Sequence, residues 1–161
     1  MASRRSKLGV VLFGVVVAAI ALAFGGPMAD VHTPGPPPAT VTFVDSDGET
    51  LGTVQAHVAD DPQERFTGLS DTDSMAADEG MVFVFEREDD RAFVMRDMDF
   101  PLDIVFVGAD GHITEIAHAP VENDTPLTRY EGRAKWVVEV NRGWTEEHGV
   151  SEGDEVRIDR T

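Results

Sequence analysis

The sequence predicts a mainly β domain with one or two short helices (α+β), preceded by one N-terminal hydrophobic helix. We expect a compact curled antiparallel sheet or a partly closed barrel. Three observations predict this class. Apolar and polar residues alternate with a period of two over most of the chain after residue 40, Asp-Gly pairs separate alternating segments, and only two short segments carry helix signals. Many short strands with few helices are typical of sheets that curl on themselves.

The N-terminal helix is predicted from an uncharged, mostly apolar run at residues 8–24 that follows three basic residues. Such a run reaches about 25 Å as a helix, which is longer than most signal-peptide cores. We predict a signal anchor over residues 1–26, with a cleaved signal peptide as the alternative. The basic residues stay inside, so the rest of the chain lies outside the cell membrane, or is secreted if the signal is cleaved.

Residues 27–39 are rich in proline and form a predicted extended linker, so the β-rich domain covers residues 40–161. Its first elements are a β-hairpin and a helix. Residues 41–44 and 51–58 flank an acidic turn ending in Asp-Gly, which supplies the positive φ that a tight turn needs. Asp61 can cap a helix that begins with proline and carries a capping-box glutamate, and Gly68 can end it.

The second half of the domain repeats the hairpin pattern. Residues 101–107 and 112–117 are separated by Asp110-Gly111, and residues 144–148, closed by Gly149, predict a second helical turn. The remaining predicted strands are residues 81–85, 92–95, 134–140 and 155–158.

The composition is strongly acidic, with 30 acidic and 13 basic residues and a net charge of −17. Concentrated salt screens the self-repulsion of such a surface, so the composition indicates a halophilic protein. Nucleic acid is not an expected partner, because phosphate binding needs a basic surface. The absence of cysteine excludes disulfides, thiol nucleophiles and thiolate metal sites.

Several motifs follow one another in a fixed order between residues 61 and 158. They are Glu64-Arg65, Gly68-Leu69 and the segments 79–85, 93–96, 101–106 and 137–140. In this order they resemble the domain of unknown function family 192, a set of small, often exported prokaryotic proteins. The resemblance implies a single β-rich domain and supplies no established reaction. The family typically has an aromatic-methionine-lysine-asparagine-threonine run where this chain has residues 94–98, so Asp97 would make a pocket mouth there more acidic.

Two acidic side chains, Asp103 and Glu139, fall on strand faces that are otherwise apolar. A buried carboxylate needs a cation or several hydrogen-bond donors. Arginines 65, 96 and 142 are the candidate cations, either in structural ion pairs or around an anionic or sugar-like ligand. Trp144 follows a predicted loop, where it either packs locally or stacks on a ligand. The candidate ligand-binding residues are Arg65, Arg96, Asp97, Asp103, Asn141 and Trp144.

The sequence thus predicts a membrane-tethered extracytoplasmic binding or accessory domain of unknown molecular function, anchored through residues 8–24. One alternative is an envelope glycan hydrolase with Asp103 and Glu139 as its paired carboxylates. Another is a purely structural partner of an envelope protein. The histidines lack the spacing of metal ligands, and no metal or cofactor is expected.

Overall fold

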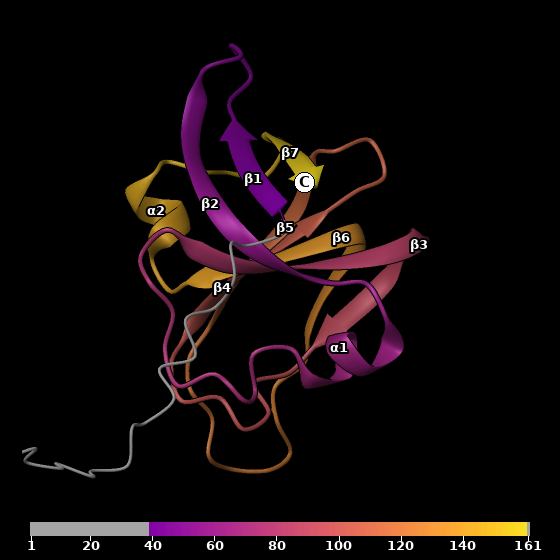
Figure 1. Ribbon diagram of the computed structural model, residues 1–161, viewed down its shortest axis with the longest axis vertical. Helices are drawn as coiled ribbons and strands as arrows, with labels where there is room; N and C mark the ends of the chain where they lie inside the picture. Colours follow the sequence, from indigo (N-terminus) through magenta and orange to yellow (C-terminus); the bar gives the residue numbers. More distant parts are fainter. Residues whose placement is uncertain (1–38, 161) are drawn as a thin grey trace, which may run out of the picture. The chain divides into compact units, whose positions relative to one another are not determined.

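The computed structural model describes residues 39–160, which form a seven-stranded sheet and two short helices (Figure 1). The predicted N-terminal helix and residues 27–38 of the predicted linker lie outside the described residues, whereas Ala39, the last residue of the predicted linker, begins the first strand. Within residues 39–160 no helix has the length and apolar character needed to span a membrane. In chain order the elements are β1 (Ala39–Val44), β2 (Thr50–Ala59), α1 (Pro62–Thr67), β3 (Glu79–Phe93), β4 (Leu102–Val107), β5 (Ile113–Ala119), β6 (Tyr130–Asn141), α2 (Trp144–Glu147) and β7 (Glu155–Arg160).

The sheet is mainly antiparallel, as predicted, with the strand order β5-β4-β6-β3-β2-β1-β7. The exception is the parallel pairing of β2 with β3. The edges approach each other at an isolated bridge between His112 and Glu155, and no ladder among residues 39–160 closes the sheet. The mainly β class with two short helices is therefore confirmed, and the sheet is not closed into a full barrel, because its edges meet only around this bridge.

Both predicted hairpins are present, as β1–β2 and β4–β5. Helix α1 also begins and ends where the sequence predicts. The Asp61 carboxylate accepts hydrogen bonds from the backbone N–H groups of Gln63 and Glu64 at 2.7 and 2.9 Å, and the Glu64 side chain completes the capping box. Gly68 ends the helix at φ 52°, in the region that favours glycine. These local signals fix α1 directly after β2.

Strand β3 differs from the prediction. The separate strands expected at 81–85 and 92–95 are one strand, Glu79–Phe93, which pairs with β6 on both sides of a register shift between Val84 and Asp89. Residues 86–90, an acidic run interrupted by Arg87, break the alternation in the sequence, but the neighbouring strand keeps this segment extended. This long strand carries both aromatic and basic side chains to one site.

The sheet buries a hydrophobic cluster on each face. Alternate residues of β4 and β6 point to opposite faces, so Val105 and Val138 pack in the first cluster, while Ile104 and Val137 pack in the second. The first cluster is completed by β1, β7 and the α2 region, and the second by Leu69, which follows α1, and the loop after β3. Aromatic rings, with Phe83 and Phe93 centroids 4.9 Å apart, form the centre of the second cluster.

Candidate functional site

The two predicted catalytic carboxylates lie on opposite faces of the sheet. On β4, Asp103 pairs with Val140, whereas Glu139 of β6 pairs with Ile104. Paired residues in a sheet share a face and adjacent residues do not, so the two carboxyl groups point away from each other. The structure does not bring them together around one cleft.

Asp103 is fully buried and all its hydrogen-bonding capacity goes to the protein. One oxygen accepts from the His118 ring Nδ1 at 2.7 Å and from the Arg142 guanidinium at 3.2 Å. The other accepts from the Gly143 backbone N–H and from the N–H and hydroxyl of Thr145, at 2.7 to 3.1 Å. The carboxylate thus ties the β4–β5 hairpin to the start of α2 and has a structural role.

Two other predicted ligand-binding residues, Trp144 and Asn141, also have structural surroundings. Trp144 is 5% exposed and stacks on His148, so local packing accounts for it. The Asn141 side chain donates to the Ala76 carbonyl at 2.8 Å. Asp97 is exposed and borders a hollow together with Arg96 and Asp99.

The other face of the sheet carries a pocket of about 340 Å³ between α1, β3 and the loop that follows β3. Aromatic and aliphatic side chains form part of its wall, and three half-buried arginines line it with the buried Glu139. The arginines are Arg65 from α1, Arg91 from β3 and Arg96 from the loop. We call this cavity the arginine pocket. Of the predicted site residues, it brings together Arg65, Arg96 and Glu139.

The three arginines of the pocket have no carboxylate partner within 4.0 Å among the described residues. Arg65 donates to the Val84 carbonyl at 3.1 Å, and Arg96 donates to the Phe66 carbonyl. Their guanidinium groups also lie over aromatic rings, Arg65 over Phe85 at 5.3 Å and Arg96 over Phe66 at 4.1 Å. These contacts orient the cations without neutralising them.

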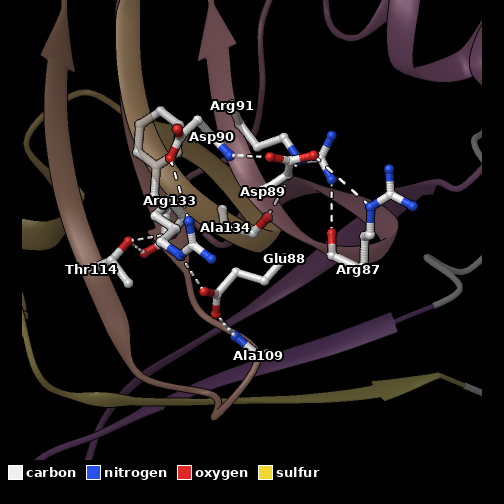
Figure 2. Close-up of polar contacts among 10 residues, drawn as sticks. Arg87, Glu88, Asp89, Asp90, Arg91, Ala109, Thr114, Arg133 and Ala134 are labelled. Carbon is white, nitrogen blue, oxygen red and sulfur yellow. Dashed lines mark hydrogen bonds and ion pairs between the residues drawn. The ribbon is translucent and has the colours of Figure 1, made fainter.

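The other six arginines of residues 39–160 each have a carboxylate within 4.0 Å. Figure 2 shows the contrast at one end of β3: Arg133 is paired with Glu88, whereas Arg91 donates to the carbonyls of Arg87 and Ala134. Although the chain has 30 acidic residues, the arginines without a carboxylate partner in this described part are therefore gathered around one pocket.

Glu139 is a further unusual ionisable group of this pocket, beside the three arginines. Glu139 is only 6% exposed, and its side chain forms no hydrogen bond or ion pair with the described residues. Burial raises the pKa of Glu139 to about 8, because the surroundings disfavour the charged form. At neutral pH this carboxyl group is mostly protonated. No group of three or more His, Asp or Glu residues within 39–160 is arranged to hold a metal ion.

Arg91 was absent from the predicted site. The acidic run before it split the predicted strand and hid its place on the face of Phe83, Phe85 and Phe93. The alternation of these odd-numbered positions is the sequence signal that would have revealed one continuous strand.

A family model matches residues 42–158, that of DUF192, described as an uncharacterized ACR. The chain belongs to the DUF192 family. The resemblance found in the sequence is thereby confirmed, and the matched range of this DUF192 domain contains every residue of the arginine pocket.

Two solved structures are similar to this DUF192 domain. One, from Sinorhizobium meliloti 1021, bears the name "putative transcription regulator"; it is 29% identical, with a TM-score of 0.67, over 74% of this chain and 92% of the other. The second is a protein of unknown function from Novosphingobium aromaticivorans DSM 12444, 30% identical, with a TM-score of 0.65, over 73% of this chain and 83% of the other. No curated protein matches the sequence.

Proposed function

We propose that this DUF192 domain binds a small anionic ligand with an apolar portion in the arginine pocket. The observation that carries the proposal is the distribution of arginine partners within residues 39–160: six arginines are neutralised by carboxylates, and the three that are not line the same cavity. A guanidinium group binds carboxylate or phosphate through parallel hydrogen bonds, and partial burial strengthens them. An anionic ligand would supply the missing partner.

The walls of the pocket define the rest of the ligand. Phe83, Phe93 and Leu102 line the cavity and belong to the second hydrophobic cluster. A volume of about 340 Å³ suits a small organic molecule, since ligand pockets begin at about 300 Å³. The ligand therefore combines an acidic group at the arginines with an aromatic or aliphatic part against these side chains.

The two alternatives have less support. A paired-carboxylate hydrolase needs both acids within one cleft, and Asp103 and Glu139 point to opposite faces. A purely structural role leaves the cavity and its unpaired arginines unexplained.

Removing an arginine of the pocket should weaken ligand binding with little effect on folding. Candidate carboxylates and organic phosphates are screened by thermal shift, and the binding of the best one is measured by calorimetry. We expect Arg65→Ala, Arg91→Ala and Arg96→Ala each to lower affinity by about tenfold or more, because each removes a charge-assisted hydrogen bond.

The matched control is Arg157→Ala on β7, which removes an exposed arginine paired with Glu155 at 2.8 Å, away from the pocket. It should bind like the unmodified chain. The proposal is contradicted if no anion stabilises the domain, or if the three pocket variants bind as tightly as the control.

We also propose that residues 8–24 tether this binding domain to the outer side of the cell membrane. The support is the apolar run behind three basic residues. External protease on intact cells should remove a tag placed after Thr161 and spare one placed before Met1. Protection of the C-terminal tag would contradict this orientation.

A further inference from the structure

The arginines account for only part of the ionisable lining of the pocket. Glu139 contributes a second polar group, which is more than nine-tenths buried and has no partner among the described residues. Its neighbours across the sheet, Met81 of β3 and Ile104 of β4, are apolar. Among residues 39–160 no fully buried side-chain oxygen lacks a partner, so the carboxyl oxygens of Glu139 are accessible from the pocket that this residue lines. A bound molecule can therefore supply the hydrogen-bond donors that the protein does not.

The protein supplies no cation for Glu139. The charged groups that share the pocket with it are Arg65 from α1, Arg91 from β3 and Arg96 from the following loop. None of them forms an ion pair with Glu139, and burial is the cause of its raised pKa, with no offsetting attraction from an arginine. The site is thus divided into half-buried cations and a separate, buried acid.

Given the anion-binding function proposed above, we propose that the ligand is zwitterionic: an amino acid with an apolar side chain, whose carboxylate binds the arginines and whose ammonium group binds Glu139. The ammonium group offers three donors to the buried carboxyl group. The apolar side chain contacts the aromatic wall around Phe83 and Phe93. Each part of the ligand then meets a part of the pocket that the protein leaves without a partner.

The proposal includes a proton transfer. In the free domain Glu139 keeps its proton at pH 7, because its pKa is about 8. A bound ammonium group stabilises the carboxylate form, so the proton leaves the Glu139 oxygen and passes to the buffer. The ligand keeps its own charges, and no other bond changes. Binding of an amino acid at pH 7 therefore releases about one proton, whereas a carboxylate without the amine releases none.

The experiment compares two probes that differ only in the amine, L-phenylalanine and 3-phenylpropanoate, with the full-length chain. Calorimetry at pH 7 in phosphate and in Tris gives both the affinity and the number of protons released, because the two buffers differ in ionisation enthalpy. We expect L-phenylalanine to bind at least about tenfold more tightly and to release about one proton. We expect 3-phenylpropanoate to bind more weakly without proton release.

Glu139→Gln is the matched variant, since the amide keeps the size of the side chain and cannot ionise. It should lose the preference for L-phenylalanine and the proton release, while retaining the affinity for 3-phenylpropanoate. Arg96→Ala should weaken both probes to a similar extent. This second variant separates the loss of the anion site from the loss of the amine site.

The outcomes distinguish the two proposals. Binding of 3-phenylpropanoate with no preference for L-phenylalanine would overturn the zwitterionic ligand and leave the anion site standing. Arginine-dependent binding of another anion, with neither probe bound, would do the same. If no anion binds, the proposed function fails and the zwitterionic ligand fails with it.

Discussion

Glu139→Gln should be more stable than the unmodified domain at pH 8, and the difference should shrink as the pH falls toward 5. Burial raises the pKa of Glu139 to about 8 in the folded state, while an unfolded glutamate titrates near 4.5. Between these values the folded state holds a proton that the unfolded state has lost, so rising pH favours unfolding. The expected slope is about −1.4 kcal/mol per pH unit, ending above pH 8, and glutamine removes it.

Urea denaturation at pH 5, 6.5 and 8 measures this effect for both proteins. Glu115→Gln, which changes an exposed glutamate of β5, is the control and should leave the pH profile as it is. Parallel profiles for Glu139→Gln and the unmodified domain would show that Glu139 is not held protonated by its surroundings.

Replacing Asp103 by alanine should cost about 3–5 kcal/mol of folding free energy, a large part of the stability of a small domain. The change leaves the Arg142 guanidinium, the Thr145 hydroxyl and two backbone N–H groups without their acceptor. Asp103→Asn should cost less, because the amide oxygen still accepts from some of these donors.

Denaturant unfolding of both variants tests this, with Asp159→Ala at an exposed position of β7 as the control. The control should change the free energy of unfolding by no more than about 0.5 kcal/mol. A cost below about 1 kcal/mol for Asp103→Ala would mean that the buried hydrogen bonds contribute little. It would also remove the structural role assigned to this carboxylate.

Local signals in the sequence predicted much of the fold. The capping box at Asp61 and the Asp-Gly turns act over a few residues, and the elements that they define are present. The length of β3 was not predicted, because the acidic run breaks its alternation and the pairing that holds it extended comes from β6. The parallel β2–β3 pair likewise depends on contacts that no short motif encodes.

The sequence identified several residues of the candidate site but not how they are arranged in space. The alternation correctly placed Asp103 and Glu139 in buried positions, but only the strand register shows that they face opposite sides. Arginines 65, 96 and 142 were all candidate cations for the buried carboxylates, and the structure places Arg142 beside Asp103, because the turn after β6 returns to the start of β4. Choosing among several arginines requires the three-dimensional path of the chain.

The parallel pairing of β2 and β3 has a consequence for how the binding site can diversify. Parallel neighbours cannot be joined by a tight turn, so residues 60–78 must cross from the end of β2 to the start of β3. This crossover includes α1, which Figure 1 shows beside the lower side of the sheet, and it contributes Arg65 and Leu69 to the arginine pocket. Insertions or substitutions there would change the lining of the arginine pocket while every strand kept its partners, so the proposed binding site can vary without a change in the sheet.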